Sequence, residues 1–76
     1  SKDEIELYNF MFRVVFNKCL YIIENKLTGY NIYKYYLDKM SNEYKKDNSS
    51  ERIILDYIAG MTDNYFIHEF EILKKI

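Results

Sequence analysis

Hydrophobic positions recur at helical spacing in three stretches of the chain, and the first stretch is apolar around most of a helix. Glu6, Asn9, Arg13 and Asn17 form one narrow polar strip on a helical wheel, and every other position from Ile5 to Phe16 is apolar. The pattern predicts a helix that begins near Asp3 and Glu4, because negative charges suit a helix N-terminus. A helix this apolar is normally covered on several sides. We therefore expect further helices or a further domain to pack against it.

The apolar run from Cys19 to Ile23 is ambiguous, since it suits a buried helical turn and a short extended segment equally well. We favour helix here, over residues 3–24, with an end or a kink near residues 17–27. Thr28 and Gly29 then mark the start of the next helix, for which Thr28 is the expected cap.

A second helix is predicted over residues 29–45. One side carries Tyr33, Leu37, Met40 and Tyr44, with Tyr36 alongside. The other side carries Lys34, Asp38, Ser41 and Lys45. This amphipathic pattern is typical of a helix with one face in the core. The polar run from residue 45 to residue 50 is then the clearest loop in the chain.

The third predicted helix spans residues 49–75 and opens at Asn48 or Ser49, because Asn48 followed by Glu51 has the spacing of a capping box. Its apolar face gathers Ile54, Leu55, Ile58, Met61, Tyr65, Phe66, Ile72, Leu73 and Ile76, and its opposite face gathers Arg52, Asp56, Gly60 and Asp63. A glycine inside a helix costs about 1 kcal/mol relative to alanine. We interpret Gly60 as a place where another element or a ligand comes close. The predicted fold is all-α, a three-helix antiparallel bundle in a single domain over residues 1–76.

Composition narrows the class of protein. The 76 residues suffice for one small domain, and the absence of proline with only two glycines favours long helices. The chain has eleven basic and twelve acidic residues, so it lacks the excess of positive charge that is typical of nucleic-acid-binding domains. We expect no membrane span, no signal peptide and a cytoplasmic location. The single cysteine, Cys19, has no partner for an internal disulfide and is expected in the core.

The segment 56–63, Asp-Tyr-Ile-Ala-Gly-Met-Thr-Asp, follows Arg52 at a fixed spacing. It resembles the C-terminal signature of the dGTP triphosphohydrolases, which belong to the HD superfamily. Residues 10–16, Phe-Met-Phe-Arg-Val-Val-Phe, are similar to a Phe-Met-Phe-x-x-Val-Tyr run that precedes the signature in that family. The chain departs from the pattern at Asn64 and Phe66, where the family usually has Arg and Ala.

The resemblance implies the C-terminal part of a larger enzyme that converts dGTP, or dNTPs generally, to a deoxynucleoside and triphosphate. It also implies a divalent metal of the Mg or Mn class, held by a His, a His-Asp pair and a further Asp in an N-terminal HD catalytic domain. This chain has only His68, followed by Glu69, so it supplies no catalytic residue and no metal ligand. We expect no cofactor in it and no hydrolysis by it alone. A start at Ser1 without Met suits a tag remnant or an excised piece of a longer protein, and we favour the second.

The candidate site residues are Arg52, Asp56, Tyr57, Gly60 and Asp63, placed next to the substrate or between domains. Asp56 would accept from a cationic side chain or a sugar hydroxyl, and Tyr57 would stack or hydrogen-bond on a nucleoside. The alternative, which we favour, is that these residues fix helix packing, with Asp56 paired to Arg52 one turn earlier.

Two other readings of the chain stay open. A freestanding helical interaction module would use the apolar excess to bind itself or another protein, and in either case we expect a homo-oligomer. A DNA-binding tail is the weakest alternative.

We interpret His68 as a partly buried hydrogen-bonding residue and the tyrosines of residues 30–44 as a core stripe, with Tyr35 exposed or at a contact. A stacking platform for single-stranded nucleic acid would need a basic groove beside them.

Overall fold

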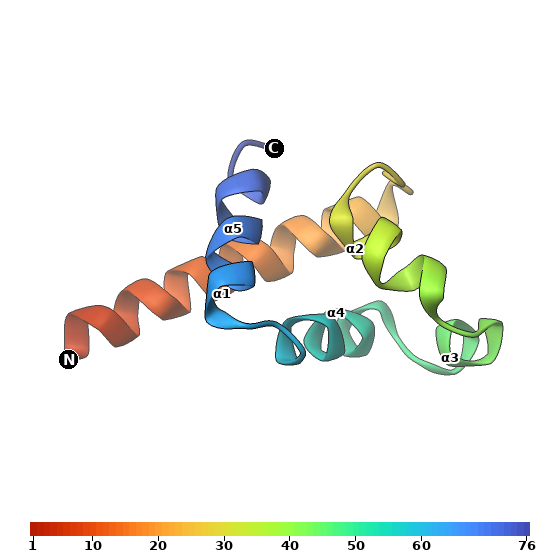
Figure 1. The fold of residues 1–76 in the computed structure, drawn as a ribbon, viewed down its shortest axis with the longest axis horizontal. Helices are drawn as coiled ribbons and strands as arrows, with labels where there is room; N and C mark the ends of the chain where they lie inside the picture. The colour runs from red at the N-terminus through yellow and green to blue at the C-terminus, as the bar shows by residue number, and fades with distance from the viewer.

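All regular structure in the computed structural model, which describes residues 1–76, is helical. The elements in chain order are α1 (Lys2–Glu24), α2 (Asn31–Tyr35), the 3₁₀ helix η1 (Leu37–Lys39), α3 (Asn42–Asp47), α4 (Ser50–Ala59) and α5 (Asp63–Leu73) (Figure 1). The prediction of an all-α fold is confirmed. The prediction of three long helices is wrong, because the second and third of them are each broken.

The long helix α1 is the support on which the other elements pack. Ser1 caps it: the Ser1 hydroxyl accepts from the Glu4 backbone N–H, and the Glu4 carboxylate reaches back to the Ser1 nitrogen. Helix α5 crosses α1, and α4 lies along its side (Figure 1). Residues 1–10 are all exposed, so within this chain the first turns of α1 lack the cover that their apolar pattern predicts.

The run from Cys19 to Ile23 is helical, and α1 continues without a break to Glu24. Asn25 then caps the helix, and its side-chain amide donates to the Tyr21 carbonyl at 2.8 Å. Lys26 adopts a positive φ of 53°, a left-handed conformation that commonly ends helices. The expected cap at Thr28 is wrong, because α2 begins after Tyr30 and has no side-chain cap.

The second predicted helix, residues 29–45, is replaced by three short elements. The backbone leaves helical geometry at Tyr36 and again at Met40, which is extended with ψ of 151°. Ser41 follows, and its hydroxyl accepts from the Tyr44 N–H at 3.0 Å to cap α3. A serine that caps a new helix competes with continuation of the old one. The apolar stripe still faces inward, since Leu37 is buried.

The third predicted helix, residues 49–75, is broken between Ala59 and Asp63. Gly60 is the C-cap of α4, so the interpretation that places it inside a helix is wrong. Thr62 is the N-cap of α5, and its hydroxyl accepts from the Tyr65 N–H at 3.1 Å. The turn at Gly60–Thr62 redirects the chain, so that α4 and α5 lie at a steep angle to each other (Figure 1).

The start of α4 is capped by Ser49. Its hydroxyl accepts from the Arg52 N–H at 3.1 Å. Asn48 instead donates its side-chain amide to the Tyr44 carbonyl at 2.9 Å, so the expected capping box of Asn48 and Glu51 does not form. Asn48 thereby ties the end of α3 to the start of α4.

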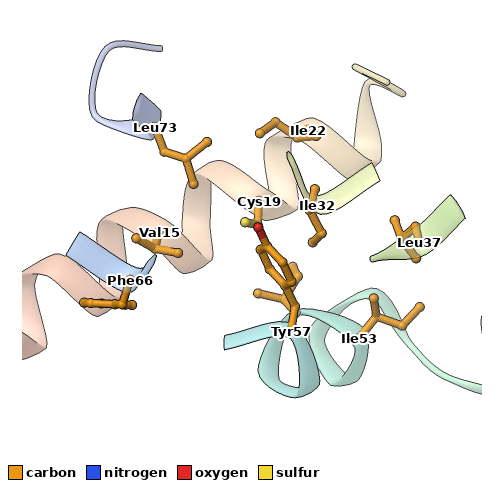
Figure 2. Close-up of a cluster of buried hydrophobic side chains, with 10 residues drawn as sticks. Val15, Cys19, Ile22, Ile32, Leu37, Ile53, Tyr57, Phe66 and Leu73 are labelled. Atoms are coloured by element: carbon orange, nitrogen blue, oxygen red, sulfur yellow. The ribbon is translucent and has the colours of Figure 1, made fainter. Parts of the chain in front are cut away.

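The buried core draws on every element except α3. It consists of Val15, Cys19, Ile22, Ile32, Leu37, Ile53, Ile54, Tyr57, Phe66 and Leu73 (Figure 2). Each buried aliphatic side chain of this size contributes about 1.5–3 kcal/mol. The expectation that Cys19 is a core residue is confirmed. Ile53, absent from the predicted apolar face, is buried, whereas Leu55 is 39% exposed, because the break before α5 frees α4 to adopt its own rotation. None of the helices combines the length and the hydropathy that a membrane span requires.

Candidate functional site

A cleft of about 370 Å³ opens where α4 ends and α5 begins. It is lined by Tyr35, Tyr36, Asp56, Tyr57, Gly60, Met61, Thr62 and Tyr65. Its volume lies near the lower end of the range for small-molecule sites, roughly 300–1,000 Å³. Three of the five candidate residues, Asp56, Tyr57 and Gly60, line this cleft. The other two, Arg52 and Asp63, do not line it.

Asp56 is the charged group of the cleft, and hydrogen bonds occupy both of its oxygens. Oδ1 accepts from Arg52 Nε at 3.1 Å and from Arg52 Nη2 at 2.9 Å, while Oδ2 accepts from the Tyr44 hydroxyl at 2.6 Å. The hydrogen bond from Tyr44, followed by that from Arg52, lowers the pKa of Asp56 below its usual value. Asp56 is therefore ionised at neutral pH. The predicted pair with Arg52 is present, with 30% of the Asp56 side chain still exposed.

Tyr57 lies deeper than expected, with only 6% of its surface exposed. Its ring packs against that of Tyr36, with 5.4 Å between centroids, and its hydroxyl points toward Cys19 (Figure 2). Burial raises the pKa of Tyr57, so the phenol stays protonated. Tyr57 forms part of the floor of the cleft, and its hydroxyl is engaged inside the protein.

The partner of Tyr57 is Glu69, which is not among the candidate residues predicted from the sequence. Glu69 is 1% exposed. Its Oε1 accepts from the Asn31 side-chain amide at 2.6 Å, and its Oε2 accepts from the Tyr57 hydroxyl at 2.9 Å. The signal was available: Glu69 lies three residues after Phe66 and four before Leu73, on the buried face of α5.

Gly60 is exposed at the edge of the cleft, and a Cβ added there would meet only the carbonyl oxygens of Asp56 and Tyr57, each at 3.8 Å. That is ordinary contact, so packing within this chain does not require a glycine. Asp63 is exposed and begins α5, where its charge suits the helix N-terminus. The polar face predicted to unite Asp63 with Asp56 is therefore divided by the break between the two helices.

His68 is exposed and forms no side-chain hydrogen bond, so its interpretation as a partly buried residue is wrong. No group of three or more His, Cys, Asp or Glu residues is arranged to hold a metal ion. The residues of this chain do not fit a metal centre. What the cleft offers instead is one carboxylate, several phenol rings and a hydroxyl from Thr62.

The family model of the phosphohydrolase-associated domain matches residues 29–72, more than half of the chain. The chain belongs to the phosphohydrolase-associated domain family. This domain is associated with HD phosphohydrolases, which confirms the HD part of the resemblance. The match includes every residue that lines the cleft. It leaves out all of α1, and therefore also the similar run at residues 10–16. Searches of curated proteins and of solved structures each gave no significant match.

Proposed function

We propose that this phosphohydrolase-associated domain is the C-terminal part of an HD-family triphosphohydrolase acting on dGTP or other dNTPs, and that its cleft completes the substrate pocket. One observation carries the proposal. Asp56, Tyr57 and Gly60, all from the segment that resembles the dGTP triphosphohydrolase signature, meet at a single cleft inside the region that matches the family.

The chemistry of the cleft suits the nucleoside end of the substrate. Tyrosine rings offer surfaces on which a base stacks. The ionised carboxylate of Asp56 accepts from hydroxyl or amino groups, and it repels phosphate. Arg52 contacts Asp56, but its guanidinium is already paired with that carboxylate. The triphosphate is therefore expected to lie outside this cleft, against other parts of the parent enzyme.

The metal and the attack on phosphorus belong, in this proposal, to a separate N-terminal HD catalytic domain. A divalent ion of the Mg or Mn class would supply charge neutralisation and a more acidic bound water. The residues of this domain would bind and orient the nucleoside. Without that catalytic domain the 76-residue chain is expected to be inactive.

The test is hydrolysis by the full-length protein. Each dNTP is incubated with Mg²⁺ or Mn²⁺, and the deoxynucleoside and intact triphosphate are quantified. Asp56→Asn removes a charged acceptor, and hydrogen bonds to charged groups contribute about 1.5–3 kcal/mol, so kcat/KM is expected to fall about 10- to 150-fold. Glu71→Gln, an exposed change on α5, is the matched control. A full-length protein inert toward every dNTP with either metal would contradict the proposal.

A second candidate function, a helical interaction module that pairs with a second copy of itself, is favoured by the exposed start of α1. Ile5, Leu7 and Phe10 are 62%, 58% and 50% exposed. Large apolar side chains grouped in this way mark contact surfaces. The coding sequence upstream of Ser1 separates the two candidates. A His, then a His-Asp pair, then a lone Asp in predicted helices favours the hydrolase, and their absence favours the module.

A further inference from the structure

The hydrogen bonds around Glu69 have a fixed direction. A carboxylate oxygen that accepts from a hydroxyl uses that hydroxyl's proton, and a phenol has a single proton to donate. The Tyr57 hydroxyl donates its one hydrogen bond to Glu69 Oε2, at 2.9 Å. The contact of 3.0 Å between the hydroxyls of Tyr57 and Tyr65 must then use the proton of Tyr65. The series runs from Tyr65 to Tyr57 to Glu69, and Tyr65 keeps a free lone pair.

A second series with the same logic ends at Asp56. The Tyr44 hydroxyl donates to Asp56 Oδ2 at 2.6 Å. Tyr44 therefore accepts in its 2.9 Å contact with the Tyr36 hydroxyl, and Tyr36 is the donor. Both Tyr36 and Tyr65 line the cleft, and the protons of both are committed to partners inside the chain. Their oxygens, with the carboxylate of Asp56, offer a ligand in the cleft hydrogen-bond acceptors.

We propose that Glu69 is a positioning residue that makes Tyr65 an acceptor in the cleft, so that the cleft favours a nucleobase carrying an exocyclic amino group. This inference rests on the proposed function in one respect, namely that the ligand is a nucleoside. Glu69 itself is buried and touches no ligand. It acts through Tyr57 on Tyr65, both of which line the cleft.

The burial of Glu69 supports a role beyond packing. Removing a carboxylate from water costs several kcal/mol, and an apolar side chain of similar volume usually serves a core as well or better. Here both oxygens of Glu69 accept hydrogen bonds, and no buried side-chain nitrogen or oxygen in the chain lacks a partner. A hydrogen-bonded buried carboxylate contributes what an apolar residue cannot, which is a fixed direction for the hydroxyl protons next to it.

The discriminating variant is Glu69→Gln, because its volume is nearly unchanged. The glutamine oxygen still accepts from Asn31, but its NH₂ group now donates to the Tyr57 oxygen. The proton of Tyr57 is then free to turn toward Tyr65, and that of Tyr65 toward the cleft. Glu69→Gln therefore converts an acceptor in the cleft into a donor without opening a cavity.

The probes are 2′-deoxyguanosine and 2′-deoxyinosine, which differ by one amino group, and binding to the full-length protein is measured by calorimetry. One hydrogen bond contributes about 0.5–1.5 kcal/mol, so wild type is expected to prefer deoxyguanosine about 2- to 13-fold. In Glu69→Gln the ratio is expected to fall to about one or below. Tyr65→Phe, which removes the acceptor itself, gives the same loss and decides the matter if Glu69→Gln fails to fold.

Two matched controls keep the wild-type ratio. Glu71→Gln changes an exposed glutamate on the same helix, and Tyr21→Phe removes a phenol outside the cleft. A merely structural Glu69 would weaken both nucleosides equally, which overturns the inference. Equal binding of the two nucleosides by wild type, or binding of neither, overturns it too.

Hydrolysis of dNTPs by the same preparations separates this inference from the proposed function. If the protein hydrolyses dNTPs but Glu69→Gln leaves the preference for deoxyguanosine over deoxyinosine unchanged, only the positioning role is rejected. If Glu69→Gln changes that preference but the protein hydrolyses no dNTP, the positioning role is supported and the triphosphohydrolase activity is rejected.

Discussion

Tyr57 and Glu69 are 12 residues apart in the sequence, yet the Tyr57 hydroxyl lies 2.9 Å from Glu69 Oε2 inside the protein. In one continuous helix these residues would be separated by about 18 Å along the axis. The hydrogen bond forms only because α4 ends at Gly60 and α5 starts again in a new direction. The break in the predicted third helix thus creates both the buried pair and the cleft beside it.

Glu69→Ala is expected to destabilise the protein by about 3–5 kcal/mol, because the Asn31 amide and the Tyr57 hydroxyl lose their hydrogen-bond acceptor and a cavity is left. Urea unfolding at pH 7 measures the change. Glu71→Ala, at an exposed position of the same helix, is expected to stay within about 0.5 kcal/mol. Equal effects of the two substitutions would contradict the buried network.

Asp56→Asn is expected to show a stability deficit that depends on pH. The pKa of Asp56 is lowered in the folded protein by Tyr44 and then by Arg52, relative to about 3.9 in the unfolded chain. The sign follows from linkage: this stabilisation is present above about pH 4 and is lost as the pH falls through the folded pKa. Wild type should therefore exceed Asp56→Asn by more at pH 7 than at pH 3. A gap that is constant between these pH values argues against the depressed pKa.

Cys19 is expected to resist thiol reagents in the folded protein. Burial, with a smaller contribution from the charge of Glu69, raises the pKa of Cys19 to about 12, and the side chain is fully buried. The reaction with a disulfide reagent at pH 8, followed by absorbance, should be at least about 100-fold slower in buffer than in denaturing urea. Equal rates in the two solutions would show that the core of Figure 2 is open to solvent.

Gly60→Ala is expected to separate stability from function. The backbone at Gly60 has φ of −85° and ψ of −1°, which alanine adopts freely, and an added Cβ meets no close contact. Stability should change by less than about 1 kcal/mol. Hydrolysis of dNTPs by the full-length protein should fall, because the new methyl group narrows the edge of the cleft. Thr62→Ala, which removes the cap of α5, should instead cost about 1 kcal/mol. Full activity in Gly60→Ala would show that the edge of the cleft at Gly60 is not part of the substrate site.

The isolated chain is expected to self-associate through the start of α1. A groove of about 490 Å³ runs between α1 and α5, lined by Glu4, Leu7, Tyr8, Met11, Ile67, Phe70 and Glu71. Leu7→Lys should lower the apparent mass measured by light scattering at high concentration, whereas Thr28→Lys, at an exposed position after α1, should not. A monomeric wild-type chain at high concentration would refute this expectation.

The features that the sequence predicted are the local ones. The first helix, predicted over residues 3–24, and the burial of Cys19 depend on neighbours within two turns, and both predictions are confirmed. The breaks were missed because Ser41 and Thr62 sit within a continuing apolar period. Their role as caps shows only when the next turn forms in a new direction.

The candidate site was predictable in part. The resemblance drew attention to Asp56, Tyr57 and Gly60, which do meet at the cleft. The partners that fix them, Tyr44 and Glu69, are each 12 residues away from the group that they bind, so no spacing rule for a single helix finds them. Buried hydrogen bonds of this kind depend on how separate elements pack, which periodicity does not encode.

The chain contains nine tyrosines and no tryptophan, so tyrosine dominates its near-ultraviolet absorption and its intrinsic fluorescence. Four of those tyrosines line the cleft, and two of these four have hydroxyls that are joined directly to each other. The molecule thus carries a built-in optical reporter: a base stacked in the cleft would quench emission from the rings that contact it, and no label would be required.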